Sequence, residues 1–133
     1  MTKPLAGLRV LDLTHMLSGP FGTLTLADLG AEVIKIEPLQ GEATRRLLAG
    51  DPKNSIAGMG AYFINLNRNK KSVAIDLKSE AGRDLFYELV KQADIVFDNF
   101  SVGVTASLGI DYERLSTVNP RVITCSITGF GST

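Results

Sequence analysis

The sequence has almost no sulfur chemistry and no excess of charge of either sign. It contains one cysteine and no tryptophan, and its 14 Lys and Arg residues balance its 14 Asp and Glu residues. A single cysteine excludes an internal disulfide and disfavours a metal cluster. The balanced charge gives no broad electrostatic footprint for nucleic acid or for an acidic membrane surface. We therefore expect neither a nucleic-acid partner nor a bound metal.

Long hydrophobic runs are also missing. The first residues, Met-Thr-Lys-Pro, lack the apolar core of a signal peptide. Nowhere do about 18 apolar residues follow one another, as a membrane-spanning helix requires. These absences predict a cytoplasmic protein with no membrane segment. The length of 133 residues fits one domain or part of one.

Five short apolar, β-branched runs are present, and helical patterns separate them. The runs cover residues 9–13, 32–37, 72–77, 94–98 and 121–127. Continuous apolarity is typical of strands that are buried on both faces of a parallel sheet. The alternation predicts a doubly wound, mainly parallel, open α/β sheet of the Rossmann-like class. The loops after the strands then share the carboxyl edge of the sheet, where such folds bind ligands.

The first predicted helix follows the first strand. Pro20 suits its first turn, and Ser18 or Gly19 is expected to cap it. Gly30 fits the left-handed position that often ends a helix.

Two further helices are predicted, and one long segment has no clear pattern. The second helix covers about residues 80–92 with Ser79 as its cap, and a weaker third covers residues 111–118. Residues 38–61 show no period, so we expect a long loop that is functional or partly disordered.

The glycines after the first strand raise the question of a dinucleotide site. An NAD fingerprint needs G-x-G-x-x-G, whereas positions 19–22 read only GPFG. Pro20 removes an N–H donor, and Phe21 crowds the approach of a pyrophosphate. Glu37, after the second strand, stands roughly where an acid would bind the ribose. The pattern leaves two alternatives: an ordinary helix start with Gly22 packed on a strand, or contact with another nucleotide-like ligand.

Several residues with reactive or charged side chains are interpreted as structural. Arg68, Lys70 and Lys71 form a short basic run that is typical of a solvated face, with phosphate contact as the weaker alternative. His15 is expected to form hydrogen bonds within its loop. Cys125 lies in an apolar strand and is expected in the core, since a reactive thiol needs an exposed, electropositive setting.

Five motifs, in order along the chain, resemble those of the family III CoA-transferases. They read PLAGLRVLDLTHMLSGPFGTLTLADLGAEVIKIEP at 4–38, NRNKKSVAIDLK at 67–78, ADIVFDNF at 93–100, LGIDYERL at 108–115 and NPRVITCSITGFG at 119–131. That group includes formyl-CoA and carnitine CoA-transferases, and it shares its fold with α-methylacyl-CoA racemase. The resemblance covers essentially the whole chain and implies the N-terminal portion of such an enzyme.

The resemblance also implies a ligand, coenzyme A, bound as an acyl-CoA substrate along the carboxyl edge of the sheet. The implied contacts are Leu17, Ser18, Ile75, Asp76, Leu77, Lys78, Asn99, Phe100 and Ser101. Among these, Phe100 offers a stacking surface and Lys78 a point charge suited to phosphate. Asn99 offers both a donor and an acceptor. Ser101 and Ser107 stand where family members commonly carry arginine, which predicts weakened phosphate binding.

The implied function is to move CoA between carboxylic acids, with the full-length enzyme acting as a homodimer. Family members are much longer, and their nucleophilic aspartate lies beyond the position of residue 133. We therefore assign no catalytic residue here; Asp12, Asp76 and Asp98 lie within or at the ends of strands. Two alternatives stay open: the N-terminal segment of a racemase-type epimerase, and a noncatalytic remnant.

Overall fold

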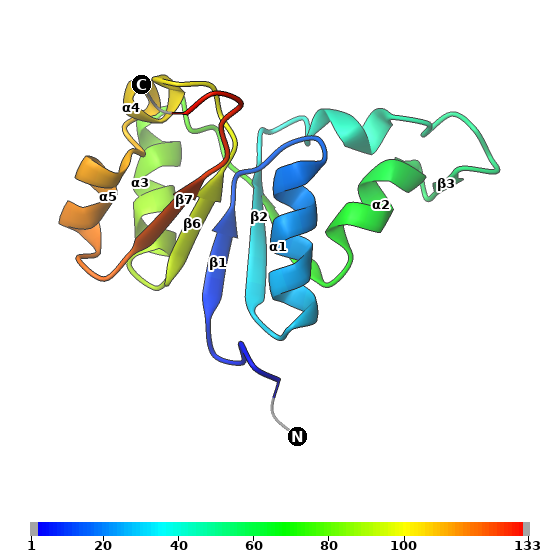
Figure 1. Cartoon of the computed structure of the whole chain (residues 1–133). Helices are drawn as coiled ribbons and strands as arrows, with labels where there is room; N and C mark the ends of the chain where they lie inside the picture. Colours follow the sequence, from blue (N-terminus) through cyan, green and yellow to red (C-terminus); the bar gives the residue numbers. More distant parts are fainter. Residues whose placement is uncertain (1–2, 132–133) are drawn as a thin grey trace.

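Five parallel strands form one sheet at the centre of the molecule. The computed structural model describes residues 3–131. The strands are β1 (Arg9–Asp12), β2 (Glu32–Glu37), β5 (Lys70–Ala74), β6 (Ile95–Asp98) and β7 (Ile123–Ser126). They lie in the order β5-β2-β1-β6-β7, and every neighbouring pair is parallel (Figure 1). The predicted doubly wound α/β sheet is confirmed, although β5 begins two residues before the predicted strand.

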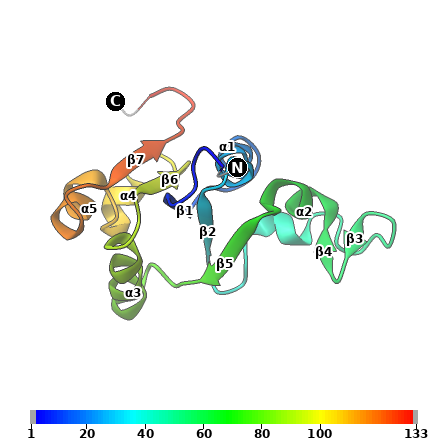
Figure 2. The same cartoon turned by 90° about the horizontal axis from the view of Figure 1, so that it is seen from below.

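Helices cover both faces of this sheet. They are α1 (Ser18–Asp28), α2 (Ala61–Asn67), α3 (Glu80–Val90), α4 (Val104–Leu108) and α5 (Tyr112–Val118). Helix α1 packs on one face with α2 beside it, whereas α3 and α5 pack on the other (Figure 2). Right-handed crossovers require this split, because the chain moves one way from β1 to β2 and the other way from β5 to β7. Within residues 3–131, no helix is both long and apolar enough to cross a membrane.

The segment between β2 and α2, residues 38–60, is called the arm below. It contains a short 3-10 helix (Ala43–Arg46) and a hairpin formed by β3 (Ser55–Ile56) and β4 (Met59–Gly60). The hairpin lies out beyond α2, away from the sheet (Figure 1). The predicted long loop therefore contains short ordered elements that the sequence did not indicate. Its ordered turns are too short to produce a periodic pattern of apolar residues.

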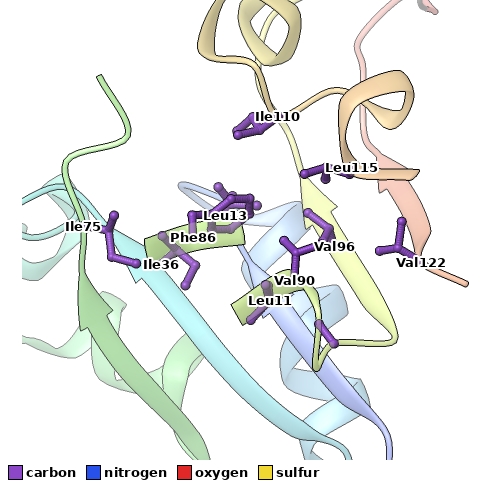
Figure 3. Packing of buried hydrophobic residues seen from close by; sticks show 11 residues of the cluster. Leu11, Leu13, Ile36, Ile75, Phe86, Val90, Val96, Ile110, Leu115 and Val122 are labelled. Atoms are coloured by element: carbon purple, nitrogen blue, oxygen red, sulfur yellow. The ribbon is translucent and has the colours of Figure 1, made fainter. Parts of the chain in front are cut away.

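Two hydrophobic cores lie on opposite faces of the sheet, because successive side chains of a strand point to opposite sides. On the α1 face, Val10 and Val33 pack with Ala27 and Ala31. The larger core, on the α3 face, contains Leu11, Leu13, Ile36, Ile75, Phe86, Val90, Ala93, Val96, Ile110, Leu115 and Val122. Ile75, Ile36 and Leu13 follow one another across its upper end (Figure 3).

Helix ends agree with the sequence in part. The Ser79 hydroxyl accepts a hydrogen bond from the Gly82 N–H at 3.0 Å, so the predicted cap of α3 is confirmed. Gly30 ends α1 with φ at +108°, as predicted. The predicted cap of α1 is wrong, because Leu17 occupies the cap position and Ser18 is already helical. Leu17 has φ −118° and ψ −68°, outside the extended geometry that a capping side chain needs.

The expectation for Cys125 is also wrong, because this residue is exposed. It lies on β7, an edge strand, opposite Phe97 of β6 and on the same side as Ile123. The side chain of Ile123 is 61% exposed, so this side of β7 is left uncovered by α1. An edge strand with an apolar sequence can have one face buried and the other exposed to solvent. Cys125 lies on the exposed face of β7.

Candidate ligand site at the carboxyl edge of the sheet

The order of the strands reverses between β1 and β6. From β1 the chain continues to β2 on one side, whereas β6 leads to β7 on the other. The loops that follow β1 and β6 therefore diverge and leave a crevice between them. In open α/β sheets this switch point is where ligands bind.

A cavity of about 180 Å³ lies beside this switch point. Its base is apolar, because Leu13, Ile36 and Ile75 are core residues at the ends of three neighbouring strands. The remaining lining residues are His15, Glu37, Pro38, Asp76, Leu77, Lys78, Phe100 and Leu108. Asp76 and Lys78 are exposed, so they stand at the rim. The cavity thus combines an apolar floor with polar and charged groups at its mouth.

Two aromatic rings from different loops face one another at this cavity. The ring centroids of His15 and Phe100 are 5.4 Å apart, with an angle of 51° between the ring planes. Burial, aided by the charge of Lys35, lowers the pKa of His15 below its ordinary value of 6.5. A neutral imidazole at pH 7 follows, and its ring lies beside that of Phe100 at the wall of the cavity.

Asn99 joins the loops that diverge at the switch point. Its Oδ1 accepts a hydrogen bond from the His15 N–H at 2.8 Å, and its Nδ2 donates to the His15 carbonyl at 2.8 Å. Asp98 fixes the next residue, since its Oδ1 accepts the Phe100 N–H at 3.1 Å. These bonds set the relative position of the two rings. The hydrogen bonds of His15 shown here are thus made by its backbone and join it to another loop, whereas the expectation placed them within its own loop; its ring lines the cavity.

The structure brings together some of the residues that the family resemblance implied. Ile75, Asp76, Leu77, Lys78 and Phe100 line the cavity.

The other implied residues lie outside that cavity. Leu17 and Ser18 are exposed at the start of α1. Ser101 lies in a neighbouring hollow of about 330 Å³ between the loops after β6 and β7. Asn99 and Phe100 also line this second hollow, so it adjoins the cavity.

Sequence reasoning missed several lining residues. Leu13 and Ile36 come from strand ends, and their position at the carboxyl edge was the available signal. Leu108 belongs to α4, a helix that was not predicted. Gly103 precedes α4 with φ at +83° and makes the turn into it. A helix of five residues is too short to show a hydrophobic period.

Glu37 lies after the second strand, roughly where an acid would bind the ribose of NAD. Its carboxylate already accepts hydrogen bonds from other groups of the protein. Its Oε1 accepts from Arg45 Nη2 at 2.6 Å and from the Ser72 hydroxyl at 2.5 Å. Its Oε2 accepts from Arg45 Nε at 2.7 Å and from the Glu42 N–H at 2.9 Å. Burial opposes ionisation, but these hydrogen bonds lower the pKa of Glu37 to about 2. Both carboxylate oxygens are already used, which argues further against an NAD site.

A second buried ion pair corrects the interpretation of the basic run. Lys70 is not solvated: its side chain is 1% exposed, and its Nζ lies 2.9 Å from Asp12 Oδ2. Burial would raise the pKa of Asp12, but the charges of Lys35 and Lys70 lower it overall. Arg68 and Lys71 do face solvent, with side chains 58% and 70% exposed.

Comparison with known proteins now identifies the family. The model of CoA-transferase family III matches residues 5–133. The chain belongs to this family. An acetyl-CoA:oxalate CoA-transferase of Acetobacter aceti is 47% identical over 98% of this chain, which covers 32% of the relative's length. A succinyl-CoA:glutarate CoA-transferase of Mus musculus is 44% identical over 98% of this chain and 29% of its own length.

Solved structures of the family agree with the fold. A CAIB/BAIF family protein of Brucella suis is 44% identical and superposes with a TM-score of 0.90, over 100% of this chain and 35% of its own. The chain thus spans about a third of the length of the relatives it matches.

The resemblance set two serines, Ser101 and Ser107, against arginines of the family. Ser107 is exposed and donates a hydrogen bond to the Val104 carbonyl at 2.9 Å.

Proposed function

We propose that this chain is the CoA-binding N-terminal segment of an acyl-CoA:carboxylate CoA-transferase, an enzyme that moves CoA between carboxylic acids. Family membership supports the class of reaction, and the named relatives use oxalate or glutarate as the acid. The observation that carries the proposal is the cavity at the switch point, because residues implied by the family line it together.

The size and lining of the cavity suggest which part of CoA it receives. A volume of about 180 Å³ is smaller than the roughly 300–1,000 Å³ typical of a site for a whole ligand. We assign it to the adenine ring, with Phe100 and His15 as the stacking surface and Leu77 as an apolar contact. The phosphates then lie at the mouth, within reach of the Lys78 ammonium. The second hollow, which shares Phe100, offers a path for the pantetheine arm.

The acyl-transfer chemistry is assigned to residues outside this part of the protein. Covalent catalysis needs a carboxylate that reaches the thioester carbon. Asp12 is fully buried, and its oxygens accept bonds from Thr14, Thr23 and Lys70. Asp98 is 6% exposed and engaged by Phe100 and Ser126. Neither carboxylate is placed to attack a bound ligand.

Calorimetric titration of the 133-residue chain with CoA, and separately with NADH, tests the proposal. We expect saturable binding of CoA and none of NADH. Lys78→Ala should weaken CoA binding about tenfold, because a charge-assisted phosphate contact contributes roughly 1.5–3 kcal/mol and exposure reduces that figure. Lys91→Ala is the matched control, since Lys91 is an exposed lysine at the end of α3 paired with Glu88, and it should change affinity less than twofold.

Two further results complete this test. A thioester-exchange assay between acyl-CoA and a free acid should show no turnover by the chain alone, because effective molarity is lost without the nucleophile. Saturable NADH binding without CoA binding would overturn the assignment of the ligand. Turnover that disappears in Asp76→Ala would overturn the assignment of the chemistry, because Asp76 lies at the rim of the cavity.

A further inference from the structure

A carboxylate from the arm lies beneath the loop that follows β1. Glu42 is 1% exposed, and its Oε1 accepts a hydrogen bond from the Met16 N–H at 3.1 Å. Lys35, equally buried, approaches Glu42 Oε2 at 3.7 Å and donates to the Thr14 carbonyl at 2.7 Å. The two side chains thus hold the backbone on either side of His15, whose ring lines the cavity.

The loop needs such contacts because part of it is strained. Met16 has φ at +66°, a region that a side chain with a Cβ atom rarely adopts. A strained residue of this kind persists only while its surroundings fix it. The Met16 N–H is fixed by Glu42, and Asn99 holds the neighbouring His15 at both its N–H and its carbonyl. Without Glu42, Met16 is free to relax toward an extended conformation.

Glu42 is itself fixed by the sheet. Its backbone N–H donates to Glu37 Oε2 at 2.9 Å. Arg45 and Ser72 hold the same carboxylate, and Ser72 belongs to the edge strand β5. A continuous series of hydrogen bonds therefore runs from β5, through the arm, to the loop beside the cavity. Both carboxylates in this series, those of Glu37 and Glu42, are buried, so water competes poorly with their hydrogen bonds.

We propose that Glu42 is a positioning residue, which holds the loop of residues 14–17 in its binding conformation and thereby sets the affinity of the cavity for CoA. This inference rests on the proposed function for the identity of the ligand. The position of the loop can be measured without any ligand. The positioning role of Glu42 and the proposed function can therefore be refuted separately.

The test compares Glu42→Met with Glu42→Gln in the 133-residue chain. The first removes the acceptor of the Met16 N–H at nearly the same side-chain volume, and the second keeps an oxygen in place. In Glu42→Met, amide hydrogen exchange of Met16, followed by NMR, should accelerate about 10- to 100-fold. The Kd for CoA, measured by calorimetry, should rise about tenfold. Glu42→Gln should restore most of both values.

The matched control is Ser55→Ala, which removes a hydrogen bond of the arm that lies outside this series, from the Ser55 hydroxyl to the Asp51 carbonyl at 2.8 Å. It should change neither the exchange of Met16 nor the Kd by more than twofold. If Glu42→Met does not fold, Glu42→Asp replaces it. That variant keeps a negative charge near Lys35, but its side chain is one methylene shorter. It should therefore lose the hydrogen bond from the Met16 N–H, and the amide exchange of Met16 should accelerate by the same factor.

Two results overturn the positioning role. One is unchanged Met16 exchange in both Glu42→Met and Glu42→Asp. The other is accelerated exchange with an unchanged Kd, which shows that the conformation of the loop does not govern affinity. Failure of the unaltered chain to bind CoA overturns the proposed function instead, and the exchange of Met16 then still decides whether Glu42 positions the loop.

Discussion

Replacing Lys70 with methionine should destabilise the protein strongly. The Lys70 ammonium has four oxygens within hydrogen-bond distance, those of Asp12 Oδ2, Thr23 Oγ1, the Pro20 carbonyl and Asn67 Oδ1, at 2.8–3.0 Å, and its three N–H groups donate among them. Asp12 is fully buried, so Lys70→Met leaves a carboxylate without its nearest cation. Breaking a buried pair in this way costs about 3–5 kcal/mol. That is a large share of the roughly 5–15 kcal/mol that stabilises a domain.

Urea unfolding followed by circular dichroism measures this loss. With an m-value of about 2 kcal/mol per M, the midpoint should fall by about 1.5–2.5 M. Lys71→Met is the matched control from the adjacent position. Lys71 is 70% exposed and pairs with Glu32 at the surface, so its loss should cost less than about 1 kcal/mol.

The pH dependence of the same variant provides an independent signature. In the native protein the pKa of Asp12 lies below its ordinary value of 3.8, although burial alone would raise it. Lys70→Met removes one of the two cations that lower this pKa, so the pKa of Asp12 is higher in the folded variant than in the native protein. The stability deficit of the variant therefore grows as pH rises through the interval between the two pKa values, and it should be larger at pH 7 than at pH 4.

If Lys70→Met does not fold, a double variant still tests whether the unpaired Asp12 carboxylate causes the loss of stability. When Asp12→Asn is combined with Lys70→Met, no buried charge is left unpaired, and the amide that replaces the carboxylate can still accept from Thr14 and donate to Thr23. The double variant should recover at least about 2 kcal/mol of the loss. A midpoint shift below about 0.5 M for Lys70→Met, or a deficit that does not shrink toward pH 4, would refute the argument.

Two further predictions concern the arm. Because the pKa of Glu37 falls from 4.5 to about 2, its ionised carboxylate, held by Arg45, the Glu42 N–H and Ser72, should contribute about 3 kcal/mol of stability above pH 5 that is lost as pH falls toward 2. Stability curves of the native protein and Glu37→Gln that stay parallel down to pH 2.5 would contradict this. Gly60→Ala should cost about 1–3 kcal/mol in urea unfolding, because a Cβ there would lie 1.6 Å from the Leu47 carbonyl oxygen, whereas Gly50→Ala, with open space around it, should be tolerated.

The sheet was predictable from sequence because its central strands carry a simple signal. Buried parallel strands carry apolar residues on both faces, and the Val, Leu and Ile residues within 9–12 and 32–37 give this signal although charged residues stand among them. Ser79 and Gly30 marked helix ends through local chemistry that needs no tertiary contact. The cavity followed in part, because the carboxyl ends of parallel strands meet at one edge, and the family resemblance named several of the residues that line it.

The interior charges could not be predicted in the same way, and Lys70 shows why. The predicted strand began at residue 72, which left both Lys70 and Lys71 in a loop. Once β5 is known to start at Lys70, the alternation of side chains along a strand requires the two lysines to face opposite sides of the sheet. One then meets Asp12 under α1, while the other meets Glu32 at the surface. Because the predicted strand began two residues too late, Lys70 was expected on a solvated face, whereas its charge is buried in an ion pair.

The partners of these charges lie on other structural elements, which explains why no helical or strand pattern reveals them. Each carboxylate on the α1 face of the sheet pairs with a cation from another element: Asp12 with Lys70, Glu42 with Lys35 and Glu37 with Arg45. Burial of one member alone would be strongly unfavourable. The pairs can therefore form only when the sheet and the arm close together. The arm is thus fixed to the sheet by charges rather than by an apolar face, and this is why a segment with no hydrophobic period is nevertheless ordered beside the cavity.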